Sequence, residues 1–173
     1  MLRASVKAGV ITLALLLGFV CMAEAAPFEE GVAAYKREDY ATALRLTRPL
    51  AEEGNAAAQA LLALMYALGQ GVPQDYAAAL AWYRKSADHG LASAQCDLGT
   101  MYERGLGVRQ DYAAALGWYR KAADQGYADA QASMGYLYDN GLGVARDVAE
   151  ARKWMQKAAE NGNNNAKDWL KSH

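Results

Sequence analysis

The sequence is poor in cysteine, proline and histidine, and this scarcity excludes several classes of protein. Only two cysteines, three prolines and two histidines occur among 173 residues. One cysteine lies in the N-terminal leader described below, so the remaining chain has no partner for an internal disulfide, and no His/Cys cluster has the spacing of metal ligands. We therefore expect no metal and no cofactor, and a domain held together by packing alone.

The charges are almost balanced. Lysine and arginine together number 18, aspartate and glutamate 19, and the formal net charge is −1. A chain without a basic excess or a charged tail does not point to a nucleic-acid partner. Because 53% of the residues are hydrophobic, alanine is abundant and proline is rare, the composition favours a helical, foldable domain.

The first 25 residues form a separate segment. Arg3 and Lys7 come before an apolar run at 8–20, which is followed by small residues ending at Ala25. This order is typical of a secretory signal peptide, since the apolar run is too short to cross a hydrocarbon core of about 30 Å comfortably. We predict cleavage after Ala25, with an uncleaved membrane anchor as the alternative. The mature domain is then expected to be periplasmic or secreted, without stable insertion in a membrane.

A cysteine near the end of this leader raises the question of lipidation. Lipoprotein signals carry a small residue before the modified cysteine, whereas here the bulky Val20 precedes Cys21. The sequence therefore argues against a lipoprotein.

The rest of the chain has a period of 36 residues. The segment DYAAALAWYRKSADHG at 75–90 recurs as DYAAALGWYRKAADQG at 111–126 and as DVAEARKWMQKAAENG at 147–162. A fixed period of this length is typical of stacked repeat proteins. We divide the chain into a degenerate unit at 26–54, three full units at 55–90, 91–126 and 127–162, and a C-terminal capping helix at 163–173.

Each full unit predicts two helices. In the second unit Ala94, Leu98 and Met101 share one face of the first helix, and Trp118 and Tyr119 share one face of the second. A glycine is placed to end each first helix and an aspartate to cap each second helix. These residues are Gly69, Gly105 and Gly141, and Asp75, Asp111 and Asp147.

One tryptophan per unit stands in the second helix, and two short helices cannot bury it alone. We therefore expect neighbouring units to cover Trp82, Trp118 and Trp154. Since Trp118 lies in the middle unit, its removal is expected to damage folding more than removal of Trp154.

The full units share the pattern A-x-A-Q-x-x-L-G-x-M-Y-x-x-G-x-G-V-x-x-D-Y-x-x-A-x-x-W-Y-x-K-A-A-x-x-G, which resembles the Sel-one-like repeat (SLR), a relative of the tetratricopeptide repeat. The departures are small: Ala63 replaces a glycine and Val148 a tyrosine. The short turn between Tyr35 and Asp39 makes the first unit similar to a tetratricopeptide repeat. The resemblance implies an all-α fold, a right-handed α-solenoid that acts as an adaptor or regulator by binding other proteins.

From this resemblance and the predicted signal peptide we expect an exported, non-enzymatic scaffold that binds a periplasmic protein or peptide. The alternative is a cell-wall-directed enzyme or binder of β-lactamase or penicillin-binding type, which is linked to a cysteine-rich branch of the same family. That branch carries paired cysteines in each repeat, which this chain lacks, and no serine stands in a G-x-S-x-G or S-x-x-K motif. We therefore predict no catalytic residue.

A stripe of positions on the first helices varies between units and faces away from the repeated core positions. Solenoids bind partners along their concave surfaces, so we predict that this stripe forms a protein-binding groove with Leu64, Thr100 and Tyr136 along its centre. The alternatives are a plain solvated or inter-repeat face and, for Cys96, a small packed residue or a reactive thiol. The stripe consists of Ala60, Leu64, Ala67, Cys96, Thr100, Glu103, Ala132, Tyr136 and Asp139.

Overall fold

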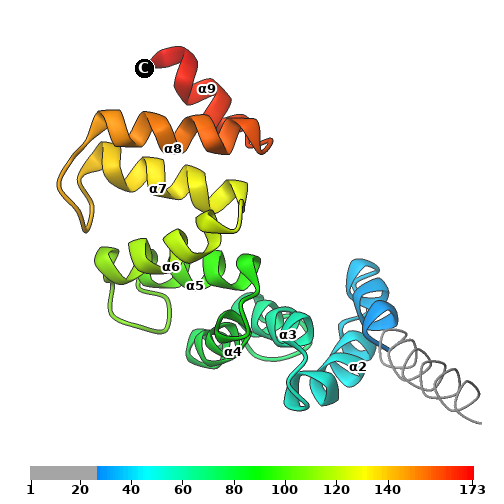
Figure 1. The fold of residues 1–173 in the computed structure, drawn as a ribbon. Helices are drawn as coiled ribbons and strands as arrows, with labels where there is room; N and C mark the ends of the chain where they lie inside the picture. Colours follow the sequence, from blue (N-terminus) through cyan, green and yellow to red (C-terminus); the bar gives the residue numbers. More distant parts are fainter. Residues whose placement is uncertain (1–26) are drawn as a thin grey trace, which may run out of the picture.

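The computed structural model describes residues 27–173, and the predicted signal peptide lies outside the described residues. Over this range the protein is all-α, as predicted, with paired helices stacked into a curved array (Figure 1). A helical segment at 27–36 comes first. It is followed by α2 (Tyr40–Glu52), α3 (Ala56–Leu68), α4 (Tyr76–Asp88), α5 (Ala92–Arg104), α6 (Tyr112–Asp124), α7 (Ala128–Asn140), α8 (Val148–Glu160) and α9 (Asn164–Ser172).

The helices form hairpins that repeat every 36 residues. α3 packs on α4, α5 on α6 and α7 on α8, and each hairpin also contacts the next one along the chain. In the first hairpin the turn is short, and Glu38 takes a left-handed φ of 62° to make it. None of the helices described between residues 27 and 173 has the length and apolar character needed to cross a membrane.

The helix ends follow the predicted signals. Gly69, Gly105 and Gly141 end the first helices at φ values of 69°, 69° and 65°, a left-handed conformation that glycine adopts at least cost. The carboxylates of Asp111 and Asp147 each accept a 2.9 Å hydrogen bond from a backbone N–H in the first turn of the following helix. Asp75 and Asp39 cap their helices in the same way.

The loop between paired helices rests on the preceding unit. At Gly107 an added Cβ would lie 2.4 Å from the Tyr76 carbonyl oxygen, and at Gly143 it would lie 2.5 Å from the Tyr112 carbonyl carbon. Only a residue without a side chain fits there, so these glycines set how closely successive hairpins approach.

Within each hairpin a large side chain of the second helix packs against a small residue of the first. An added Cβ on Gly99 would lie 2.7 Å from the ring of Tyr119, and one on Gly135 would lie 2.8 Å from Met155. Tyr119 is 1% exposed as a result and belongs to the same core cluster as Met134.

The tryptophans differ from the expectation that each is buried. Only Trp154 is buried, at 6% exposed, whereas Trp82 and Trp118 are half-buried. Lys85 and Lys121 lie over the rings of these two residues, 3.9 and 3.8 Å from the ring centroids. The lysine side chains therefore cover, through their stems and through cation–π contact, the part of each tryptophan ring that the neighbouring hairpin does not bury.

A repeated hydrogen-bond bridge joins successive hairpins. A buried glutamine in each first helix donates through Nε2 to a carbonyl near the end of the preceding hairpin's second helix, at 3.0–3.1 Å. Its Oε1 faces a polar side chain at the end of its own second helix. The glutamines are Gln59, Gln95 and Gln131, with His89, Gln125 and Asn161 as their partners.

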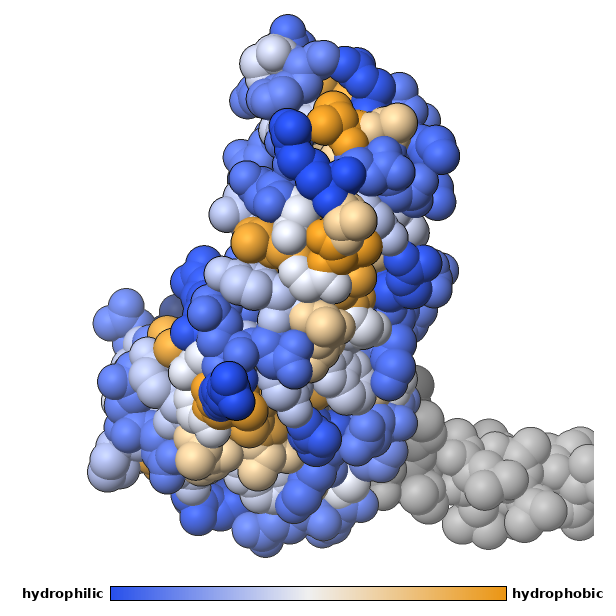
Figure 2. Space-filling model, turned by 90° about the vertical axis from the view of Figure 1, so that its left-hand side faces the viewer, coloured by the Kyte–Doolittle hydropathy of each residue, from blue (hydrophilic) through white to orange (hydrophobic). Residues whose placement is uncertain are grey.

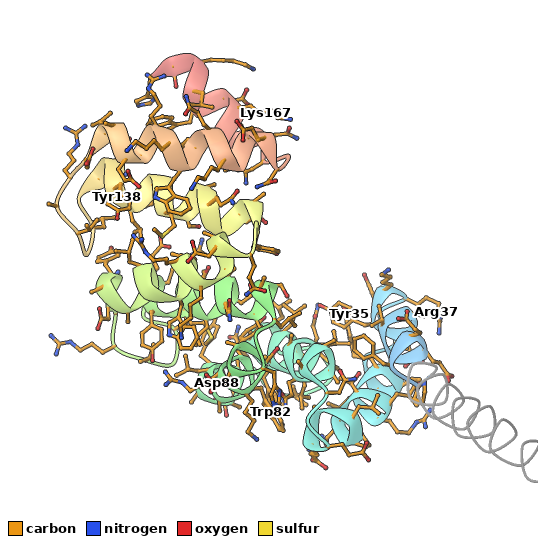
Figure 3. The ribbon with its side chains drawn as sticks, in the orientation of Figure 1. Tyr35, Arg37, Trp82, Asp88, Tyr138 and Lys167 are labelled. Atoms are coloured by element: carbon orange, nitrogen blue, oxygen red, sulfur yellow. The ribbon has the colours of Figure 1, made fainter. Side chains whose placement is uncertain are left out.

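A second repeated contact joins the second helix of one hairpin to the first helix of the next. Arg48 and Arg120 donate to the hydroxyls of Tyr66 and Tyr138, 18 residues further on, at 3.3 and 2.9 Å. Figure 3 shows Tyr138 on α7, at the level where that helix faces α6.

Candidate functional site

A groove of about 590 Å³ lies between the first helices of the C-terminal half of the array. Its walls come from α5, α7 and α9, and Tyr119 of α6 and Met155 of α8 also line it. It is lined by Thr100, Glu103, Arg104, Tyr119, Asp129, Ala132, Ser133, Tyr136, Met155, Asn163, Asn165, Ala166 and Trp169. We call this the α5–α9 groove.

Four of the nine predicted binding residues line the α5–α9 groove. Thr100 and Glu103 lie on α5, and Ala132 and Tyr136 on α7, so two successive units align their stripes as the period requires. Tyr136 is 48% exposed, among the most exposed large apolar side chains of residues 27–173. Part of the stripe thus lines a groove in the structure, through its residues in the second and third full units.

The other five predicted residues lie elsewhere. Ala60, Leu64 and Ala67 are half-buried and pack against the core around Tyr83, so the first unit does not extend the groove. The carboxylate of Asp139 is held by Arg146 at 3.4 Å and is not among the lining residues.

Cys96 is a correction to the predicted stripe. It is 7% exposed and sits in the core cluster with Tyr119 and Met134. Burial raises the pKa of its thiol to about 12, with smaller contributions from nearby carboxylates. A thiol that stays protonated at neutral pH is a poor nucleophile, so Cys96 acts as a small packed side chain.

A hydrogen-bond network fixes the floor of the groove. The hydroxyl of Tyr119 donates to Glu103 Oε2 at 2.5 Å and lies 3.0 Å from the Thr100 hydroxyl. Burial and the hydrogen bond to Glu103 raise the pKa of Tyr119, so the phenol remains a donor. The Glu103 carboxylate is therefore oriented by a neutral group.

The opposite wall is fixed in a similar way. Asn163, which caps α9, donates through Nδ2 to Asp129 Oδ1 at 2.8 Å. Trp169 donates through Nε1 to Asp139 Oδ2 at 3.3 Å, and its ring stacks on His173 at a centroid distance of 4.3 Å. The C-terminal helix thus holds an aromatic ring against the groove.

Several groove residues lie outside the predicted stripe, and the 36-residue period relates some of them to one another. Asp129 and Ser133 lie on α7, and Trp169 lies 36 residues after Ser133. The concave face is therefore wider than the predicted stripe and continues into the capping helix. Trp169 lies in the predicted capping helix, which the predicted stripe does not include.

Asp97 stands at the position of Ser133 in the preceding unit. The pKa of the Asp97 carboxyl is raised to about 6, chiefly by loss of solvation; hydrogen bonding to Tyr83 lowers it, and the charge of Asp129 raises it. The carboxyls of Asp97 and Asp129 thus lie near enough to repel each other.

A second hollow, of about 470 Å³, lies at the α5–α6 loop. Its lining is occupied by loop-forming contacts, since Gln110 Nε2 donates to the Glu103 carbonyl at 2.7 Å and Asp111 caps α6. Figure 2 shows the side of the array that carries the α5–α6 and α7–α8 loops, where apolar side chains gather in separate patches with polar ones between them. The α5–α9 groove is therefore the stronger candidate for binding.

Comparison with known proteins places the fold in a family. The chain aligns with a protective antigen of uropathogenic Escherichia coli that displays an SLR fold, at 43% identity and a TM-score of 0.81, over 85% of this chain and 32% of that one. It aligns with a Sel1 repeat protein from Oxalobacter formigenes at 39% identity and a TM-score of 0.76, over 80% and 57%. The chain thus spans about a third and just over half of the lengths of these two relatives.

A more distant likeness concerns the fold alone. Cysteine-rich protein B of Helicobacter pylori matches at 21% identity and a TM-score of 0.55, over 82% of this chain and 95% of that one. No curated protein matches the chain. The Sel1 repeat family matches residues 56–91, 92–127 and 128–163, more than half of the chain, and the protein belongs to this family of SLR solenoids.

Proposed function

We propose that this protein is an exported, non-enzymatic scaffold that binds a segment of another protein or a peptide in the α5–α9 groove. The observation that carries the proposal is the groove itself. Its volume is about 590 Å³, and four of the predicted residues line it. Stacked repeats bind along such surfaces.

The groove is built to hold its shape. The Glu103 and Asp129 carboxylates are fixed by Tyr119 and Asn163, so little side-chain ordering remains to oppose association. Tyr136 supplies an exposed aromatic ring of the kind enriched at interface centres. These features support binding without a reaction.

The cell-wall-directed enzyme gains no support from the chemistry of the groove. The thiol of Cys96 is buried and protonated, and the residue therefore offers no nucleophile to a β-lactam. The likeness to the Helicobacter pylori protein concerns the fold alone. We therefore keep the scaffold as the proposed function.

Site-specific photocrosslinking in the native cell tests the groove. A benzophenone side chain at Tyr136, in the groove, is expected to yield one discrete covalent adduct. The same group at Val148, which is 40% exposed at the start of α8 and outside the groove lining, is the matched control. Equal adducts from both positions, or an adduct from Val148 alone, would contradict the proposal.

Export is tested separately. The mature protein recovered from the periplasm or medium should begin at Ala26, the residue after the predicted cleavage site. Recovery of the intact chain in the membrane fraction would instead support the uncleaved anchor.

A further inference from the structure

The α5–α9 groove combines two carboxylates with two aromatic rings, and this combination restricts what it binds. Glu103 and Asp129 come from α5 and α7, and Tyr136 and Trp169 from α7 and α9. We propose that the groove takes an extended peptide segment through an arginine side chain, with the carboxylates as its ion-pair partners and the rings as its walls. This inference rests on the proposed function and specifies its partner.

The carboxylates are available for a cation from outside. In the part of the chain that the structure describes, the ion pairs are Arg146–Asp139, Lys153–Glu150 and Lys171–Asp168. Glu103 and Asp129 take no part in them and hold neutral donors instead. Each carboxylate has further lone pairs, since each accepts through one oxygen in these contacts.

The concave shape strengthens this negative site. Asp97 lies on the same side one unit earlier, and the repulsion between Asp97 and Asp129 contributes to the raised pKa of Asp97. Clefts lined by charge of one sign concentrate the field and attract ligands of opposite sign. Arg104, at the last position of α5, is the basic residue of the lining. The carboxylates of Glu103 and Asp129 outnumber it within the groove.

The aromatic rings favour arginine over lysine. A guanidinium is planar, stacks on aromatic faces and donates two parallel hydrogen bonds to a carboxylate, whereas an ammonium is more strongly hydrated and acts as a point charge. Tyr136 is 48% exposed and Trp169 is anchored through Asp139 at 3.3 Å, so one ring is open to contact and the other is held in place.

The test uses the purified protein and three pools of dye-labelled nonapeptides of randomised sequence, in which the central residue is arginine, lysine or citrulline. Citrulline keeps the shape of arginine without its charge. Fluorescence anisotropy should show tightest binding for the arginine pool, with the citrulline pool weaker by about tenfold or more. Equal binding of the three pools, or no binding by any, would overturn the inference.

The paired variant Glu103→Gln/Asp129→Asn removes both charges and keeps both acceptor oxygens for Tyr119 and Asn163. It should weaken arginine-pool binding by about tenfold to a hundredfold while the melting temperature stays within about 2 °C. The control variant Asp88→Asn/Asp124→Asn removes two exposed carboxylates at the ends of α4 and α6 (Asp88 is labelled in Figure 3) and should bind as the wild type does.

Two outcomes separate this inference from the proposed function. If Tyr136→Glu abolishes binding but Glu103→Gln/Asp129→Asn does not, the groove is the binding site and the arginine preference is wrong. If neither variant changes binding of the arginine pool, the peptide binds elsewhere, and both the inference and the proposed groove are overturned.

Discussion

Gln125 donates a hydrogen bond to Gln95, 30 residues earlier in the chain, at 2.8 Å. Gln95 is 6% exposed and donates in turn to the Ala87 carbonyl at 3.1 Å. One side chain thus joins the end of α4 to α5 and to the end of α6. Because the same bridge occurs at Gln59 and Gln131, it acts as a polar spacer that fixes how each hairpin sits on the one before it.

Gln95→Glu should destabilise the protein by at least about 2 kcal/mol at pH 7, because a buried carboxylate would face the Ala87 carbonyl without a proton to donate. The effect should shrink near pH 4, where the introduced carboxyl is protonated and again donates. Thermal melts of wild type and variant at both pH values check this. An equal loss at the two pH values would contradict the bridge. Gln125→Glu places the carboxylate at the exposed end of the same bridge and should cost less stability at pH 7.

Trp154→Ala should destabilise the array by about 3–5 kcal/mol, and Trp118→Ala by clearly less. Trp154 is 6% exposed in the core cluster, whereas Trp118 is half-buried under Lys121. This order reverses the expectation drawn from unit position. Chemical denaturation of both variants decides it, and a larger loss for Trp118→Ala would restore the original order.

Gly107→Ala should cost more stability than Gly126→Ala by at least about 1 kcal/mol. Both glycines have left-handed φ values, 66° and 84°, so both substitutions carry the same backbone strain, about 1–2 kcal/mol. Only at Gly107 does a neighbour, the Tyr76 carbonyl oxygen at 2.4 Å, obstruct the new methyl group.

Gly117→Ala is expected to change the stability in the opposite direction. Gly117 lies inside α6 with nothing within 4 Å of an added Cβ, so alanine should stabilise the helix by about 0.5–1 kcal/mol. Melting temperatures of the three glycine variants test the series together. A Gly107→Ala variant as stable as Gly126→Ala would show that the loop can move away from the preceding hairpin.

Asp97→Asn should stabilise the protein relative to wild type more at pH 7 than at pH 4. The folded-state pKa of Asp97, about 6, lies above its ordinary value of 3.8, so the folded form binds the proton more tightly. The contribution of Asp97 to the stability of the wild type is therefore fully present below pH 3.8 and is lost as the pH rises through 6. Paired melts across this range check it, and a difference between variant and wild type that does not change with pH would contradict it.

The repeats and their helix ends could be predicted from the sequence because they depend on local rules. Gly69, Gly105 and Gly141 end their helices in the left-handed conformation, and Asp111 and Asp147 cap theirs, as predicted. Each signal acts within one turn of the backbone, so a single unit is enough to show it.

The groove was predicted in part. Thr100, Glu103, Ala132 and Tyr136 line it, but Cys96 is buried in the core and the first-unit residues pack beside Tyr83. The sequence of one helix does not indicate how much of its surface the next hairpin buries. That depends on close contacts such as Gly107 on Tyr76, which join residues far apart in the chain.

By itself the sequence determined the period of 36 residues, the two helices of each unit and the residues that cap them, because these follow from backbone geometry and from hydrogen bonds within a few residues. Only the tertiary structure decided that Trp154 is buried while Trp118 stays half-open, and that Trp169 of the capping helix forms a wall of the groove. These features depend on how the hairpins stack, and stacking is set by packing between units rather than by any one of them.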